Sequence, residues 1–356
     1  MERINTYEKF LEAEGIPVIK GFSVFDLMDV PLKPWRRKGG MGAYILLSGS
    51  EVTTDAYVCE IPPGKSLLPQ KHLYEELIYI ISGYGATTVW TEGTAKHTFE
   101  WQPGSLFSPP LNCWHQHFNG QSDKPVRYIG ATRAPTFINL FRDLDYIFNT
   151  DHVFKNRYNA EDDYFSKKGK TFTHETITVL DTNFVQDCNE VELKQWKERG
   201  AGGATLYIEL SNNVHSVHIS RFPVGTYKKA HRHDNPGVRI LLLQGQGYSL
   251  VWPPEGGERI KIDWRQNSLF GFPNRYFHQH FNTGAEPATY MAFHGAIALK
   301  YYGIGIDDEM AGSKSLKLGG RQIEYEDEDP EIRRLFKQEL AKNGAPWDMS
   351  QYFPGE

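Results

Sequence analysis

The sequence has little cysteine, no excess of positive charge and no long apolar run. Its three cysteines, Cys59, Cys113 and Cys188, are odd in number and show no paired spacing, which favours a reducing compartment over a disulfide framework. Acidic residues outnumber basic ones, 44 to 39, so a nucleic-acid partner is not expected. No apolar run reaches the roughly 18 residues of a membrane span, and the first ten residues lack the apolar segment of a secretory signal. We therefore expect a cytoplasmic protein without a membrane or nucleic-acid partner.

The chain contains an internal duplication. The segment that begins at Trp35 returns 161 residues later at Trp196, and His115-Gln116-His117-Phe118-Asn119 returns 163 residues later as His278-Gln279-His280-Phe281-Asn282. Between these anchors, Gly83, Trp90 and Tyr128 recur as Gly245, Trp252 and Tyr290. Because the offset drifts by only two residues, the sequence predicts two copies of one domain.

Each copy has the pattern of a small all-β domain. In the first repeat, short apolar segments at 43–47, 54–61, 77–81, 87–90, 105–108 and 127–131 are separated by Pro- and Gly-rich turns. Many short strands without intervening helices favour a sandwich or a jelly-roll barrel. We expect an N-terminal arm at 1–34 with a short helix at 6–14, barrels at 35–135 and 193–300, a helical linker at 136–192, and a loop with a C-terminal helix at 301–356.

The second repeat contains a candidate metal site. His231 and His233 are two residues apart, so on an extended chain both side chains point to the same face. A return strand would bring His278 beside them. Three neutral imidazoles suit Fe, Mn, Ni, Cu or Zn and leave positions open for water or substrate.

The first repeat keeps the frame with different residues. Gln70, His72, Glu76 and His115 stand at the matching positions, and they either hold a second cation or form a decayed site. In the second repeat the place of Glu76 falls to Gly237 or Val238, neither of which binds a cation. The difference predicts different roles for the two sites.

Three further residues are candidates for substrate contacts. His117 and His280 each follow a proposed ligand by two residues, so each should face the same barrel interior, as a substrate-binding base or as a core imidazole. Arg239 could pair with a substrate carboxylate or serve a structural role. We treat His280 and Arg239 as the candidate catalytic residues.

These motifs resemble the two-part signature of the cupin superfamily. The first copy supplies Gly64, His72, Glu76, Gly83, Pro110, His115 and Asn119, and the second supplies Gly225, His231, His233, Gly245, Pro273, His278 and Asn282. The resemblance implies a bicupin, with two tandem jelly-roll barrels. The histidine trio without a carboxylate is most similar to gentisate 1,2-dioxygenase and its relatives, which implies Fe(II) and O2-dependent cleavage of an aromatic ring. Those enzymes are expected to use the N-terminal barrel, whereas the trio here is C-terminal. The Gln/His/Glu/His set resembles the manganese site of ureidoglycine aminohydrolase, which lies in the C-terminal barrel of that bicupin.

The resulting hypothesis is a non-haem Fe(II) dioxygenase that acts on a small aromatic or carboxylate-bearing substrate. The alternatives are a non-redox Mn, Ni or Zn hydrolase, lyase or isomerase, and a small-molecule binding cupin without turnover. The polar segment at 303–327 is either a lid or a tail that wraps a partner subunit. The resemblance also implies a homo-oligomer.

Overall fold

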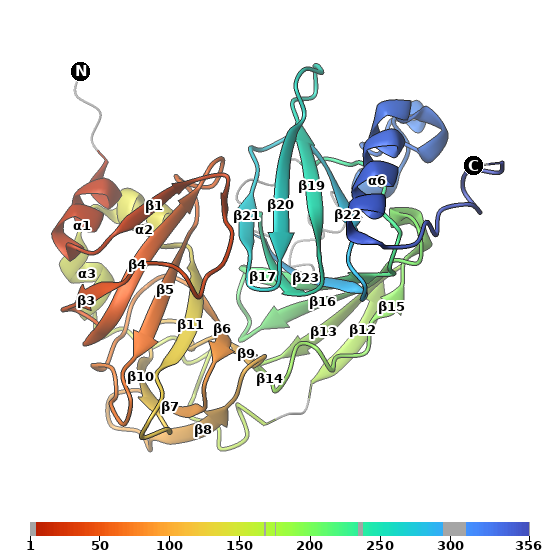
Figure 1. Ribbon diagram of the computed structural model, residues 1–356. Helices are drawn as coiled ribbons and strands as arrows, with labels where there is room; N and C mark the ends of the chain where they lie inside the picture. The colour runs from red at the N-terminus through yellow and green to blue at the C-terminus, as the bar shows by residue number, and fades with distance from the viewer. Residues whose placement is uncertain (1–4, 167–168, 175, 234–237, 295–310, 356) are drawn as a thin grey trace.

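The computed structural model describes residues 5–166, 169–174, 176–233, 238–294 and 311–355. Two β-rich halves lie side by side, the N-terminal half in red to yellow and the C-terminal half in green to blue (Figure 1). Each half contains a large sheet and a three-stranded sheet, in the jelly-roll-like arrangement that the repeats predict. The all-β fold with two tandem barrels is thus confirmed.

The N-terminal half is built from eleven strands of the first 132 residues. They are β1 (Val18–Gly21), β2 (Ser23–Val24), β3 (Lys33–Trp35), β4 (Gly40–Leu47), β5 (Asp55–Ile61), β6 (Glu76–Ser82), β7 (Gly85–Trp90), β8 (His97–Trp101), β9 (Leu106–Phe107), β10 (Trp114–Asn119) and β11 (Val126–Thr132). The large sheet runs β1-β4-β5-β11-β6-β9-β14, with β3 on β4, and the small sheet runs β10-β7-β8. The six strand segments expected from the sequence all fall on strands, whereas β8 and β10 were not anticipated.

The C-terminal half repeats this plan. Its strands are β12 (Lys170–His174), β13 (Ile177–Thr182), β14 (Phe184–Val185), β15 (Lys194–Gln195), β16 (Ala204–Leu210), β17 (Ser216–Phe222), β18 (Arg239–Gln244), β19 (Gln246–Trp252), β20 (Ile260–Arg265), β21 (Leu269–Gly271), β22 (Phe277–Asn282) and β23 (Ala288–His294). The large sheet runs β12-β13-β16-β17-β23-β18-β21-β2, with β15 on β16, and the small sheet runs β20-β19-β22.

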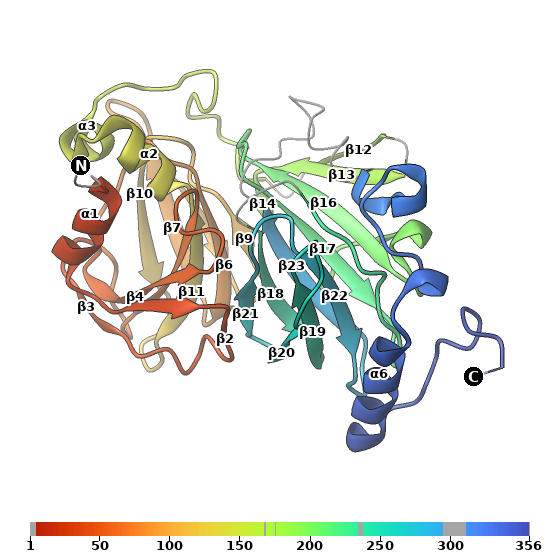
Figure 2. The same ribbon diagram turned by 90° about the horizontal axis from the view of Figure 1, so that it is seen from above.

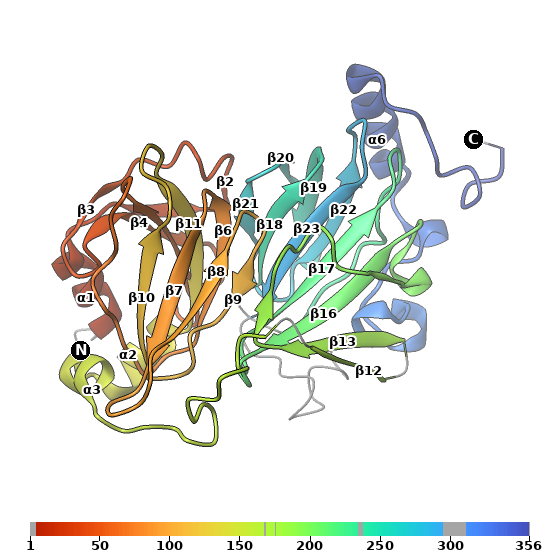
Figure 3. The same cartoon turned by 90° about the horizontal axis from the view of Figure 1, so that it is seen from below.

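The two halves exchange short strands. Near the N-terminus, β2 pairs with β21 of the C-terminal half through Ser23 and Phe270. In return, β14 pairs with β9 of the N-terminal half through Phe184 and Phe107, and the two strands lie together at the junction (Figure 3). One apolar core contains buried side chains of both halves, among them Ile129 of β11. The arm at 1–34 and the linker at 136–192 are therefore parts of the sheets.

Helices cover the outer sides of the pair. Figure 2 shows α1 (Thr6–Glu14), α2 (Ala134–Phe141) and α3 (Leu144–Asn149) on the N-terminal half and α6 (Pro330–Asn343) on the C-terminal half. Three single-turn 3-10 helices, η1 (Lys197–Arg199), η2 (Leu316–Leu318) and η3 (Tyr325–Asp327), lie in the C-terminal half. Helices α1 and α6 confirm the sequence prediction.

The linker differs from its prediction. The single helix expected after Pro135 is divided in two, because Arg142 adopts a left-handed φ of 56° that ends α2, and the Asp143 side chain caps α3. The second part of the expected helical linker forms β12, β13 and β14 instead. The expected end of the second barrel at 300 and the first part of the segment 303–327 lie outside the described residues, as does Gly237.

The C-terminal segment is attached to the outer face of β22 by a buried carboxyl group. Glu328 accepts hydrogen bonds from the Tyr227 hydroxyl and, at 3.2 Å, from the Gln279 amide. Burial raises the pKa of Glu328 to about 7, and the two hydrogen bonds only partly offset it. Among the described residues, no helix combines the length and apolarity needed to cross a membrane.

Glu328→Gln should change how the stability of the protein depends on pH. The folded state keeps a proton on Glu328 up to about pH 7, whereas the unfolded chain releases it near its ordinary pKa of 4.5. Stability should therefore fall as pH rises from about 4.5 through 7, by on the order of 3 kcal/mol in total, and Glu328→Gln should remove this slope. Urea unfolding at a series of pH values measures it, with the exposed Glu331→Gln as the control. Equal slopes in wild type and Glu328→Gln would contradict the assignment.

Candidate metal centres

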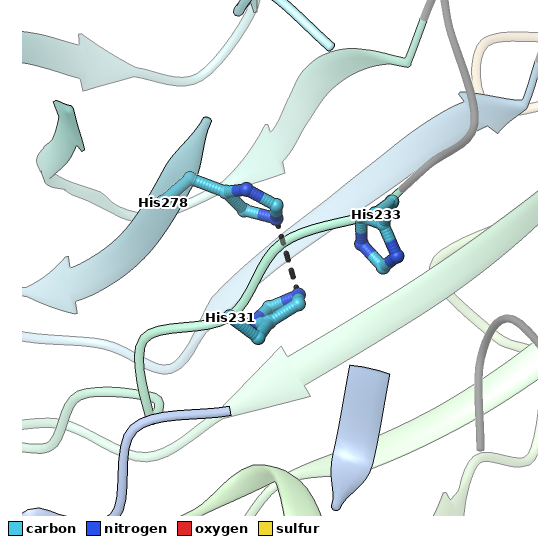
Figure 4. A group of neighbouring side chains, drawn as sticks. All are labelled: His231, His233 and His278. Atoms are coloured by element: carbon cyan, nitrogen blue, oxygen red, sulfur yellow. Dashed lines mark hydrogen bonds between the residues drawn. The ribbon is translucent and has the colours of Figure 1, made fainter. Parts of the chain in front are cut away.

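Backbone pairing brings the three histidines of the second repeat together. His231 lies on the segment after β17, and its amide and carbonyl pair with those of His278 on β22, at 3.1 and 2.9 Å. The three imidazoles point toward one another (Figure 4). The ligand nitrogens of His231, His233 and His278 all lie within 4.8 Å of one another, and all three residues are buried. The expected trio is thus assembled.

Hydrogen bonds to carbonyl groups orient two of these imidazoles. Nδ1 of His231 lies 3.1 Å from the Lys229 carbonyl, and Nδ1 of His278 lies 3.3 Å from the Tyr276 carbonyl. Because a carbonyl only accepts, each Nδ1 carries the hydrogen and each Nε2 presents a lone pair. These two Nε2 atoms face each other at 3.1 Å. Two converging lone pairs repel unless a cation lies between them, so the donor set fits a metal ion.

The electrostatic surroundings keep the trio neutral. Burial is the main cause that lowers the pKa of His231 well below its ordinary value, and the nearby Arg199 guanidinium and the other imidazoles add to it. Burial and His233 likewise lower the pKa of His278. Neutral imidazole is the form that binds a metal, so the site is available at neutral pH.

Arg199 comes from η1 and occupies the place that Lys38 has in the first repeat. Its Nη1 donates to the Gly312 carbonyl at 3.0 Å. A side chain on Gly312 would approach the Arg199 guanidinium to 3.2 Å and His233 Nδ1 to 3.6 Å. Further along, Gln322 forms a backbone bridge with His231. The described end of the expected lid therefore packs directly against the trio.

The N-terminal half contains a second group, made of His72, Glu76 and His115. Their ligand atoms lie within 4.8 Å of one another, and all are buried. Nδ1 of His72 lies 2.8 Å from the Tyr74 carbonyl and Nδ1 of His115 lies 3.1 Å from the Cys113 carbonyl, so both Nε2 lone pairs are directed to Glu76 Oε2, at 3.4 and 3.7 Å. Lone pairs directed at a carboxylate again fit a cation.

The second oxygen of Glu76 is held by other groups. Oε1 accepts from the Tyr57 hydroxyl and lies 3.4 Å from the Lys38 ammonium. Burial opposes the charge of Glu76, but Lys38, His72 and His115 outweigh it and hold its pKa well below the ordinary value. The carboxylate is therefore ionised at neutral pH.

Gln70 does not join this group through its side chain. The amide oxygen accepts from Arg37 Nη1 at 2.7 Å, and the amide nitrogen donates to the Arg37 carbonyl at 2.8 Å. The backbone of Gln70 pairs with His115, as His231 pairs with His278. The expected ligand position is thus occupied by a residue whose amide is engaged elsewhere.

Arg239 lies on a different face from the trio. On β18, alternation places Arg239 with Leu241 and Leu243, which belong to the core shared by both halves, while Ile240 and Leu242 face the interior of the C-terminal half. The Arg239 guanidinium donates to the Thr54 hydroxyl of the N-terminal half. The expectation that it binds substrate beside the trio is therefore corrected, since its side chain serves the contact between halves.

His280 does face the site, and a repeated hydrogen-bond chain positions it. Trp264 Nε1 donates to the Ser249 hydroxyl at 2.9 Å, and that hydroxyl lies 2.8 Å from His280 Nδ1. The first repeat has the same chain in Trp101, Thr87 and His117, at 2.9 and 2.7 Å. The supporting Trp and Ser/Thr recur at the same offset as the histidines, so comparison of the repeats could have identified them.

The strand register also locates the counterpart of Glu76. Tyr128 pairs with Ile80 on β6, and its equivalent Tyr290 pairs with Leu242 on β18. Four residues before Ile80 stands Glu76, and four before Leu242 stands Val238. The C-terminal trio therefore has no carboxylate at that position.

Removal of the Ser249 hydroxyl should destabilise the protein. Ser249→Ala leaves two buried polar groups, Trp264 Nε1 and His280 Nδ1, without their partner, at a cost of roughly 1–3 kcal/mol. Urea denaturation measures the change. The matched control is Thr88→Ala, which removes an exposed hydroxyl pair with Thr98 and should change stability by less than about 0.5 kcal/mol. Equal effects of both substitutions would argue against the buried chain.

Comparison with known proteins agrees with this geometry. Residues 57–131 match the model of the Cupin domain family. A 5-aminosalicylate 1,2-dioxygenase from Comamonas sp is 31% identical over 84 residues, which span 24% of this chain and only 21% of that protein.

Solved structures resemble the chain over a greater length. One structure of oxalate decarboxylase from Bacillus subtilis, described for its Mn(II) centres, aligns over 78% of both chains with a TM-score of 0.52 and 14% identity. A variant of the same enzyme reaches 0.53 with the same coverage. The duplicated barrels, the two groups of metal-binding side chains and these similarities identify the chain as a metal-binding bicupin, a member of the cupin superfamily.

Proposed function

We propose that this bicupin is a non-haem Fe(II) dioxygenase whose working site is the C-terminal trio of His231, His233 and His278. The observation that carries the proposal is the convergence of neutral imidazole nitrogens with Val238 where the other half has Glu76. Bound iron would supply the oxygen chemistry, while open positions would accept substrate and O2. The short match to a 5-aminosalicylate dioxygenase supports the choice of an aromatic substrate.

The chain itself would bind and orient the substrate. Arg199 and Lys228 both lie near enough to His280 to lower its pKa, after the larger effect of burial. Two buried cations beside a divalent ion favour a substrate that carries negative charge, such as a carboxylate. His280 would contact the substrate as a neutral imidazole, because its supporting chain and its surroundings both disfavour the charged form.

Iron loading and oxygen consumption test the proposal. We expect about one iron per chain in wild type, loss of that iron and of O2 consumption with phenolic carboxylic acids in His231→Ala, and retention of both in His72→Ala. Elemental analysis and an oxygen electrode measure these quantities, and His97→Ala, outside both groups, is the control. Wild-type protein that holds iron but consumes no O2 with a broad set of phenolic acids would overturn the proposal.

A second candidate function rests on Glu76. The His72, Glu76 and His115 set has the mixed nitrogen and oxygen donors that suit manganese in non-redox catalysis, and the fold is shared with an oxalate decarboxylase described for Mn(II) centres. Manganese that persists in His231→Ala and is lost in His72→Ala, together with activity that follows it, would favour this candidate.

Arg199→Met should weaken the binding of an anionic ligand. Salicylate is a suitable probe, and its dissociation constant should rise about 10–100-fold through loss of a charge-assisted contact. Isothermal titration of iron-loaded protein measures it, with benzyl alcohol as an uncharged reference ligand. If both ligands weaken equally, Arg199 acts through the fold and not through its charge.

A further inference from the structure

Two histidines that belong to neither metal group lie close together inside the C-terminal half. His218 on β17 and His294 on β23 are buried, and His218 Nδ1 lies 2.6 Å from His294 Nε2. Their ring centroids are 4.8 Å apart. Neither residue belongs to the duplicated signature.

The repeat shows what these histidines replace. Tyr57 pairs with Gly130 in the first half, and His218 pairs with Ala292 at the equivalent place in the second. Two residues after Gly130 stands Thr132, and two after Ala292 stands His294. Tyr57 and Thr132 flank Glu76 in the first half, since Tyr57 donates to its carboxylate and Thr132 is its strand partner. The pair thus surrounds the position where the second half has Val238.

Ring contacts connect the pair to the metal site. The His280 ring lies 5.1 Å from Tyr290, and Tyr290 lies 5.7 Å from His218. The Tyr290 hydroxyl in turn accepts from Lys228 Nζ at 3.1 Å. Burial lowers the pKa of His218, followed by the effects of His294, Lys228, Arg199 and His233. His218 therefore belongs to the same interior as the trio.

A hydrogen bond between two neutral imidazoles has a defined chemistry. Each ring has one N–H, and one of the two lies in the shared bond, so the outer nitrogens of the pair present one donor and one acceptor. A proton can enter at one outer nitrogen while another leaves at the opposite end. Neither ring then has to remain charged, which matters because burial disfavours a charged imidazole here.

We propose that the His218–His294 pair relays a proton away from an acidic hydroxyl group of the ligand that the C-terminal barrel binds. The ligand O–H bond breaks as an N–H bond forms at His218 Nε2, the shared proton moves from His218 Nδ1 to His294 Nε2, and the proton on His294 Nδ1 passes to water. The substrate class is therefore one with an ionisable hydroxyl, such as a phenol. This inference rests on the proposed function of the C-terminal site.

The test uses 4-nitrocatechol as the probe, because its absorption spectrum reports loss of its hydroxyl protons. Iron-loaded wild type, His218→Gln and His294→Gln are mixed with the probe in a stopped-flow instrument, and iron content is measured on the same samples. Both variants should keep their iron and ionise the probe at least about tenfold more slowly, as expected for loss of a proton acceptor. His215→Gln is the matched control, since His215 is equally buried but lies near Arg239 and Arg133.

The outcomes separate this inference from the proposed function. Variants that keep iron and ionise the probe as fast as wild type overturn the relay alone. Variants that lose iron as His231→Ala does overturn it too, because the pair would then support the ligands. Wild-type protein that binds neither iron nor probe overturns the proposed function together with the relay.

Discussion

In both halves, a pair of backbone hydrogen bonds joins the ligand-bearing loop to the strand that carries the last histidine. Gln70 pairs with His115 at 2.9 and 2.8 Å, and His231 pairs with His278 at 3.1 and 2.9 Å. These bonds bring together residues that are about 45 positions apart in sequence. Carbonyl groups next to the ligands then fix the ring orientation through Nδ1. The metal-binding geometry depends on this backbone frame and survives changes in the side chains.

The side chains around that frame have diverged in charge. The N-terminal group combines an anionic Glu76 with Lys38 and Tyr57, so much of its charge is compensated within the protein. The C-terminal group has Val238 in place of the glutamate, Arg199 in place of the lysine and His218 in place of the tyrosine. A divalent ion there would be surrounded by neutral and positive groups, which favours an anionic ligand over a second protein carboxylate.

The two sites do not belong to separable domains. The exchange of β2 and β14 continues each large sheet with a strand of the other half, and a common core lies between them. Arg239 adds a hydrogen bond across this contact. Substitutions at the junction should therefore affect both halves at once.

The sequence by itself determined the duplication, the β class, the end helices and six of the seven proposed ligands, because repeated spacing and apolar alternation are local properties of the chain. Only the tertiary structure decided that the Gln70 amide binds Arg37, that Arg239 faces the other half, and that part of the linker forms strands. Each of these depends on a partner distant in sequence: Arg37 lies 33 residues from Gln70 and Thr54 lies 185 residues from Arg239. The His218–His294 pair, 76 residues apart, was likewise hidden until two neighbouring strands placed the rings side by side.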